Sequence, residues 1–206
     1  MYNMKIGIMT MHRVQNVGSV LQAFALQHKI EQLGHEAELI DYIFPKKKKT
    51  HFSPKSILSW GWDAFLGFPS YRKKEKVEVF RKDFLHCSPI TYLTHKDLVL
   101  NPPNYDIYCT GSDQVWNPNH VGDDTSFMLD FAPSGTHRIA YASSFASNEI
   151  KEPYFSYYAQ YIAKYNHITV RERSGVDIVK NMTGKVASVA CDPTLLLSDE
   201  EWNEVA

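Results

Sequence analysis

The sequence predicts an α/β fold, namely a doubly wound, mostly parallel, Rossmann-like sheet. Three observations lead to this prediction. Short apolar segments alternate with helical patterns along the chain, the first elements form a strand–helix–strand unit, and a polar loop containing glycine follows the first strand. Alternation of this kind is typical of parallel sheets whose crossover connections are right-handed.

The opening unit is the clearest part of the pattern. Lys5–Thr10 is predicted as a buried strand and Glu36–Tyr42 as a second strand. A helix is predicted between them, from about Ser19 to Leu33, because apolar residues recur there at the helical spacing. These residues are Val20, Ala23, Leu26, Ile30 and Leu33. Gly34 follows in the position where helices commonly end.

The alternation is interrupted by a predicted aromatic and basic insertion at about residues 43–100. The lysine run at 46–49 is predicted to be a solvated loop, with steering of an anionic substrate as the alternative. Aromatic residues in the same segment indicate a flap or a partner surface, and they are Trp60, Trp62, Phe65 and Phe68. A helix is predicted over Tyr71–Leu85.

The second half of the chain completes the predicted sheet. Strands are predicted over Tyr105–Thr110, Phe127–Phe131, Arg138–Phe145, His167–Val170 and Val186–Ala190. Helices are predicted from Pro153 to about Lys164 and over Ser174–Met182. Four tyrosines at helical spacing are predicted to pack in the core rather than to form a sugar platform, and they are Tyr154, Tyr158, Tyr161 and Tyr165.

Composition excludes several classes of protein. A net charge of −1 argues against a nucleic-acid-binding protein, which would need a basic face. Cys87, Cys109 and Cys191 have no paired spacing, so we expect neither a disulfide framework nor a zinc site, and we predict a cytoplasmic protein. No segment reaches the apolar length of a transmembrane helix. The 12 tyrosines suit either half-wet surfaces or a tyrosine-rich core, and both remain open.

Candidate site residues are concentrated directly after the strand Tyr105–Thr110. This stretch offers a glycine, a hydroxyl, a carboxylate, two amides and an indole: Gly111, Ser112, Asp113, Gln114, Trp116 and Asn117. Ligands of open parallel sheets bind in the crevice beyond the carboxyl ends of the strands. We therefore predict that these residues line a ligand crevice, with Gly111 letting a ligand approach the backbone.

A second candidate loop follows the first strand. Asn16, Gly18 and Ser19 lie at a predicted helix N-terminus, where backbone N–H groups and the helix dipole favour anions. The loop is not a dinucleotide fingerprint, because Gly7 and Gly18 lack the GxGxxG spacing. A simple N-cap by Ser19 or Asn16 is the alternative.

Five segments, in this order, resemble the polysaccharide pyruvyl transferase family. They are Lys5–Ile8 with Asn16–Ser19 and Gln22, Gly111–Asn117, Ala140–Phe145, Val170–Glu172 with Ser174, and Asp192–Leu197 with Trp202. The resemblance spans nearly the whole chain and implies one half of a GT-B-like architecture, in which two Rossmann-like domains face each other across a cleft. Residues 1–206 would then be a single amino-terminal domain, with the family's second domain absent, which leaves the activity of the isolated chain in question.

The resemblance also implies a reaction. Members of the family transfer pyruvate from phosphoenolpyruvate to sugar hydroxyls, usually forming a cyclic ketal, in polysaccharide biosynthesis. The expected partners are phosphoenolpyruvate and a sugar or lipid-linked glycan acceptor; neither a metal nor another cofactor is demanded, and a homo-oligomer is compatible. A GT-B-like glycosyltransferase using a nucleotide sugar and a non-catalytic glycan-binding fragment are the alternatives, because one fold serves all of these functions.

Three residues are candidate catalytic groups in this scheme. Arg171 ends a predicted strand and is expected to bind phosphate or carboxylate, with an ion pair to Glu172 or another acid as the alternative. Asp113 is expected to activate or hold a sugar hydroxyl, with an Asx turn or helix cap as the alternative. His12 follows the first strand and is a candidate acid or base, since imidazole titrates near neutral pH.

The remaining candidates are expected to bind the acceptor. Gln114 and Asn117 can each donate and accept hydrogen bonds, which suits a hydroxyl-rich ligand. Trp116 is predicted to stack on a sugar face, with a core position as the alternative. Finally, we predict that Gly111, Ser112 and Asp113 lie within one pocket-sized distance of Gly18 and Arg171.

Overall fold

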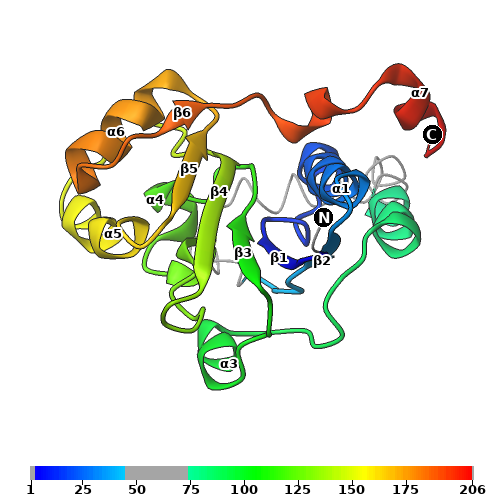
Figure 1. The fold of residues 1–206 in the computed structure, drawn as a ribbon, viewed down its shortest axis with the longest axis horizontal. Helices are drawn as coiled ribbons and strands as arrows, with labels where there is room; N and C mark the ends of the chain where they lie inside the picture. The colour runs from blue at the N-terminus through cyan, green and yellow to red at the C-terminus, as the bar shows by residue number, and fades with distance from the viewer. Residues whose placement is uncertain (1–2, 45–73, 206) are drawn as a thin grey trace, which may run out of the picture.

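The computed structural model describes residues 3–44 and 74–205, and the described residues form one six-stranded sheet (Figure 1). All five neighbouring strand pairs are parallel, in the order β2-β1-β3-β4-β5-β6. The strands are β1 (Lys5–Met9), β2 (Glu36–Leu39), β3 (Ile107–Thr110), β4 (His137–Ser143), β5 (His167–Val170) and β6 (Ser188–Val189). The predicted α/β, Rossmann-like fold is confirmed.

Helices connect the strands. They are α1 (Val17–Gln32), α3 (His95–Leu100), α4 (Pro118–Val121), α5 (Tyr154–Ile162), α6 (Arg173–Thr183) and α7 (Asp199–Asn203), with a further helix over residues 74–84. Helix α1 begins at Asn16, whose side chain accepts from the Gly18 N–H, and ends before Gly34 at φ 86°. None of the described helices combines the length and apolar character needed to span a bilayer. The lysine run at 46–49 and the aromatic residues between 60 and 68 lie outside the described residues.

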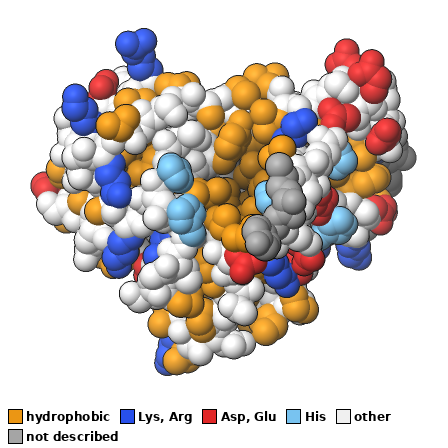
Figure 2. Space-filling view, in the orientation of Figure 1, with side chains coloured by type: hydrophobic (Ala, Val, Ile, Leu, Met, Phe, Trp, Pro, Cys, Tyr) orange, Lys and Arg blue, Asp and Glu red, His pale blue; other side chains and the backbone are white. Residues whose placement is uncertain are grey.

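Helices cover both faces of the sheet, which makes the fold doubly wound (Figure 1). Helix α1 packs on one face together with the helix over residues 74–84, while α5 and α6 pack on the other. Because side chains of a strand alternate between faces, Ile8 belongs to the first core and Met9 to the second. Hydrophobic side chains also gather in the middle of the face shown in Figure 2, whereas most charged side chains lie towards its periphery.

The strand predicted over Phe127–Phe131 is wrong. This segment begins instead as a 3-10 helix, η1 (Thr125–Met128). Asp124 caps η1 by accepting from the Ser126 N–H, and Leu129 ends it in the left-handed region at φ 56°. A short apolar run does not distinguish a strand from a buried helical turn, so the periodicity could not decide between them.

The tyrosines belong largely to the core. Tyr158 and Tyr165 are fully buried, and Tyr154 and Tyr161 are partly buried against the same core, which confirms the packing role predicted for these four tyrosines. Tyr42, Tyr92 and Tyr108 are also among the largest buried side chains. Their hydroxyls find partners inside the fold, as Tyr165 does with Thr110 Oγ1 at 2.5 Å.

Candidate active site

The sheet has its topological switch point between β1 and β3. The chain leaves β1 through α1 to reach β2 on one side, and later returns to β3 on the other side. In such sheets the loops at the carboxyl ends diverge there, and this crevice is where ligands bind. The candidate site therefore lies where β1 ends at Met9 and β3 ends at Thr110, which are register partners.

Asp113 and Ser19 form the central pair of this site. The Ser19 hydroxyl at the start of α1 donates to Asp113 Oδ2 at 2.5 Å, and Asp113 Oδ1 accepts from the Gln114 N–H at 2.7 Å. Asp113 has φ 87°, a region that residues other than glycine rarely occupy, at a cost of about 1–3 kcal/mol. Its carbonyl accepts from the Ser144 N–H at 3.0 Å, so the end of β4 holds this conformation.

A second group of contacts joins the ends of β3 and β5 to the segment after β6. The buried Ser112 hydroxyl donates to Asp192 Oδ2 at 3.5 Å, and Arg171 Nη1 donates to the same oxygen at 3.0 Å. Ser19, Ser112, Asp113 and Arg171 thus all lie at the carboxyl ends of the strands. The alternative for Arg171 is also observed, since it forms an ion pair, but its side chain remains 32% exposed.

Gly111 was predicted to let a ligand approach the backbone, but its neighbour is the side chain of Thr10. A Cβ at this position would lie 2.9 Å from Thr10 Cβ, so the missing side chain makes room for Thr10 rather than for a ligand. The Thr10 hydroxyl donates to the Ser112 carbonyl at 2.7 Å and accepts from Gln22 Nε2 at 3.0 Å. Gln22, absent from the predicted site residues, also donates to the Ser19 carbonyl at 2.7 Å. Its spacing of three residues after Ser19 on one helix was the available signal.

Trp116 does not stack on a sugar. The indole is fully buried against Phe145 and Tyr165, and Nε1 donates to the Phe127 carbonyl at 3.2 Å. The core alternative is therefore the correct one. An apolar ring with one N–H donor gains more by burial with a partner than by exposure at this position.

The two amide candidates of this loop bond mainly to each other and to the backbone. Asn117 caps α4 by accepting from the Asn119 N–H at 3.0 Å, and it donates to Gln114 Oε1 at 3.0 Å. Gln114 is half-buried and Asn117 is buried. At the other loop Asn16 is the N-cap of α1, as the alternative had it, while Gly18 is exposed.

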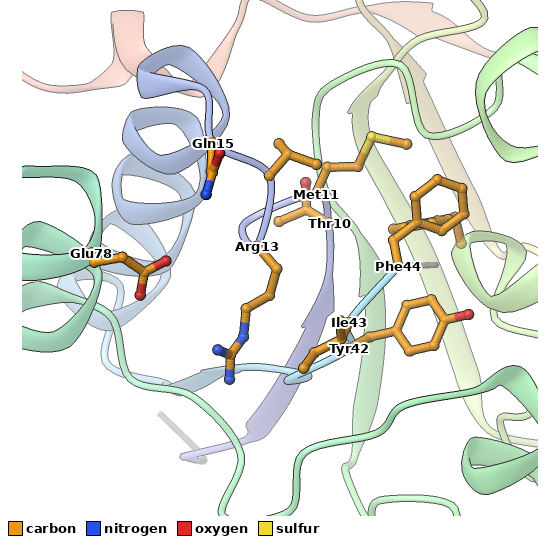
Figure 3. A pocket seen from close by; sticks show the side chains of 10 residues that line it. Thr10, Met11, Arg13, Gln15, Tyr42, Ile43, Phe44 and Glu78 are labelled. Atoms are coloured by element: carbon orange, nitrogen blue, oxygen red, sulfur yellow. The ribbon is translucent and has the colours of Figure 1, made fainter. Parts of the chain in front are cut away.

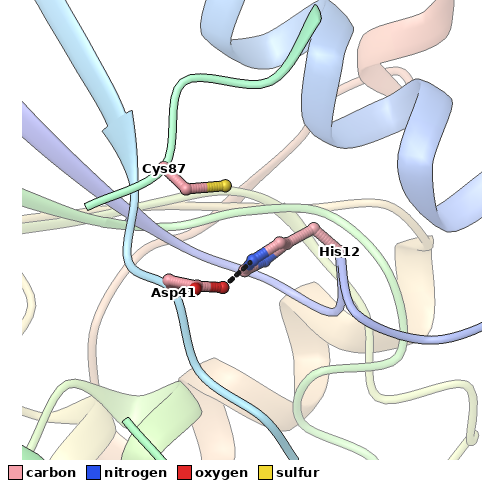
Figure 4. A group of neighbouring side chains, drawn as sticks. All are labelled: His12, Asp41 and Cys87. Carbon is pink, nitrogen blue, oxygen red and sulfur yellow. Dashed lines mark hydrogen bonds and ion pairs between the residues drawn. The ribbon is translucent and has the colours of Figure 1, made fainter. Parts of the chain in front are cut away.

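His12 lies away from the crevice, in a buried network. The ring is fully buried, and its Nε2 lies 3.2 Å from Asp41 Oδ1 (Figure 4). Its Nδ1 lies 3.2 Å from the Thr10 carbonyl oxygen. The loop after β1 turns the side chain towards the end of β2 instead of the crevice. Both ring nitrogens therefore have partners within the protein in the described structure.

Asp41 organises this buried network, and sequence reasoning did not single it out. Its carboxylate accepts from His12, from Nε of Arg13 at 2.5 Å and from Nη2 of Arg13, and from the Thr91 hydroxyl at 2.6 Å. Burial alone would raise the pKa of Asp41, but these hydrogen bonds outweigh burial and hold the pKa well below its usual range.

His12, Asp41 and Cys87 are the described residues with the geometry closest to a metal site, since their ligand atoms lie within 4.8 Å of one another (Figure 4). The Asp41 carboxylate, however, already accepts four hydrogen bonds, two of them from the Arg13 cation. Burial also raises the pKa of the Cys87 thiol, which disfavours the thiolate that binds metals. The donor set therefore suits a hydrogen-bonded network better than a metal.

Comparison with known proteins identifies the family. The model of the family described as polysaccharide pyruvyl transferase matches residues 16–206, which include Ser19, Asp113 and Arg171. No curated protein matches the sequence significantly. Since the match covers most of the chain, the protein belongs to the polysaccharide pyruvyl transferase family, which implies a transferase of polysaccharide biosynthesis acting on a glycan acceptor.

Proposed function

We propose that this protein transfers pyruvate from phosphoenolpyruvate to sugar hydroxyls with ketal formation, and that the carboxyl edge of β1 and β3 holds the acceptor. The observation that carries the proposal is the Ser19–Asp113 pair at the switch point of the sheet. A carboxylate held by strained backbone where ligands of this fold bind is a candidate base for a sugar hydroxyl.

The reaction has two stages with simple atom balance. A general acid protonates the methylene carbon of phosphoenolpyruvate, and one sugar oxygen adds to C2 while its proton leaves to a base. The C2–O bond to phosphate then breaks, inorganic phosphate departs, and the second sugar oxygen adds to C2 and loses its proton. The products are the cyclic ketal and phosphate, and both hydroxyl protons require an acceptor.

Asp113 is the proposed acceptor of a hydroxyl proton. An ionised carboxylate only accepts hydrogen bonds, and Asp113 Oδ2 already accepts one from the Ser19 hydroxyl. A sugar hydroxyl bound beside Ser19 would meet the same oxygen. Ser19 would then orient the carboxylate, because its own carbonyl is anchored by Gln22.

Arg171 is the proposed contact for the anionic groups of the donor. Only Nη1 of the guanidinium bonds to Asp192 in the described structure, and about a third of the side chain is exposed. The remaining N–H groups can therefore donate to a phosphate or carboxylate oxygen. Asp192 Oδ2 accepts from both Arg171 and the Ser112 hydroxyl, and so it holds the guanidinium near the carboxyl end of β3.

Three further statements belong to this proposal. The protein works in the cytoplasm and uses no metal or other cofactor, and residues 1–206 correspond to one half of the two-domain GT-B-like arrangement of its family. A homo-oligomer is compatible with each of them. These statements on localisation, cofactors and domain arrangement derive from the family and the composition rather than from the site geometry.

The test measures phosphate release from phosphoenolpyruvate in the presence of pyranosides that carry neighbouring hydroxyls. Turnover should yield a product heavier by one pyruvate less one water. Asp113→Asn should lower kcat about 100-fold or more, whereas Asp177→Asn on the exposed face of α6 should leave it unchanged. Stabilisation against heat by nucleotide sugars but not by phosphoenolpyruvate would contradict the proposal.

A further inference from the structure

A hollow lies beside the proposed acceptor site, at the same carboxyl ends of the strands. It has a volume of about 440 Å³ and is lined by the segments that follow β1 and β2, together with Glu78 and Phe127 (Figure 3). Cavities that bind small ligands measure about 300–1,000 Å³. The space is therefore large enough for a ligand, and its lining indicates which kind.

One wall of the hollow is aromatic. Phe44 is half-buried, and its ring packs edge-on against the buried Phe127 with centroids 5.4 Å apart. Phe127 is further fixed by Tyr42, whose hydroxyl bonds to Asp124. A half-buried ring that packs against a neighbouring ring offers a platform for the C–H face of a pyranose.

The opposite wall carries polar side chains. Figure 3 shows Arg13 between Glu78 on one side and Ile43 with Tyr42 on the other. The Asp41 carboxylate fixes the guanidinium through Nε and Nη2, while Arg81 holds the Glu78 carboxylate at 2.7 Å. Planar donors and acceptors with fixed directions are the groups that recognise sugar hydroxyls.

The charges of this wall cancel. Arg13 is neutralised by Asp41, and Glu78 by Arg81. The hydrogen bond to Arg81 also lowers the pKa of Glu78, so that carboxylate is ionised at neutral pH. An anionic ligand would find no excess positive charge among the described residues of the lining, whereas a neutral, hydroxylated ligand needs none.

The hollow adjoins the proposed reaction site through Thr10. This residue lines the hollow, and its hydroxyl donates to the carbonyl of Ser112 at 2.7 Å. Since β2, β1 and β3 are consecutive in the sheet, a chain of sugars bound at the end of β3 can continue over the ends of β1 and β2. The row of strand ends from β3 over β1 to β2 is thus suited to an extended acceptor.

We propose that this hollow is a saccharide subsite that binds a neutral pyranose unit next to the unit that is pyruvylated. Phe44 is the platform for the ring, Arg13 and Glu78 bind its hydroxyls, and Asp41 is the positioning residue for Arg13. The proposal rests on the proposed function, because it takes the acceptor to be a glycan.

Nuclear magnetic resonance on the ¹⁵N-labelled protein tests the site directly. Methyl glycosides of glucose, galactose, mannose and N-acetylglucosamine are titrated to about 50 mM, which detects a Kd in the millimolar range. At least one probe should shift the amides of Val14, Gln15 and Phe44. Phe44→Ala and Glu78→Gln should each weaken its binding about tenfold or more, whereas Val79→Ala on the exposed side of the same helix should not.

Since Phe44 contributes to packing, Glu78→Gln keeps the test valid if Phe44→Ala fails to fold. The absence of shifts at these amides with every probe overturns the subsite. Turnover of phosphoenolpyruvate with an oligosaccharide acceptor whose KM is unchanged in Glu78→Gln also overturns it, although the proposed function then stands. Probe binding at these amides without any turnover retains the binding site and refutes pyruvyl transfer by residues 1–206 alone.

Discussion

Replacing Asp41 by asparagine should destabilise this protein more than any exposed carboxylate replacement. The carboxylate is 5% exposed and accepts four hydrogen bonds, two of them from Arg13. Asparagine keeps the shape but turns one acceptor oxygen into a donor, which then faces existing donors. Removing one partner of a buried ion pair costs about 3–5 kcal/mol.

The lower end of that range applies here. The Arg13 side chain is 24% exposed, so part of its charge regains water when Asp41 is lost. We therefore expect a loss of about 3 kcal/mol, which for a chain of this length lowers Tm by about 6–12 °C. Asp83→Asn is the matched control, because Asp83 is exposed and should change stability by less than about 0.5 kcal/mol.

The pH dependence gives this prediction a distinct signature. The folded-state pKa of Asp41 is lowered, so its stabilisation is complete above the unfolded-state pKa of about 3.9 and declines as pH falls below it. Urea unfolding from pH 7 to pH 3 should show the gap between wild type and Asp41→Asn narrowing only below about pH 4. A gap under about 1 kcal/mol at pH 7 would refute the proposed role of the network.

Three other predictions concern the fold. Arg138→Met should cost about 2–4 kcal/mol in urea unfolding, because the buried guanidinium donates to the carbonyls of Leu129, Ala132, Pro133 and Thr136; a neutral result would show that water replaces it. Gly7→Ala should cost about 1–3 kcal/mol, since the new Cβ would lie 2.3 Å from the Tyr105 ring; an unchanged Tm argues against this packing. In the native protein the exposed Cys191 should react with Ellman's reagent first, while burial raises the pKa of Cys109 to about 12 and protects it; equal rates would contradict this order.

Much of the fold could be predicted from the sequence, because periodicity records which faces of an element are buried. The helix after β1 and the strands around it followed from apolar spacing and from Gly34. The segment around Phe127 did not, since its apolar residues are buried on all sides and their spacing favours no element.

The sequence by itself determined the fold class, the family resemblance and the loops that carry Ser19, Asp113 and Arg171, because loops after parallel strands share one edge. Only the tertiary structure decided what each side chain faces. It buried His12 and Trp116, filled the space beside Gly111 with Thr10, and paired Arg171 with Asp192. These outcomes depend on contacts between segments distant along the chain, which local patterns do not record.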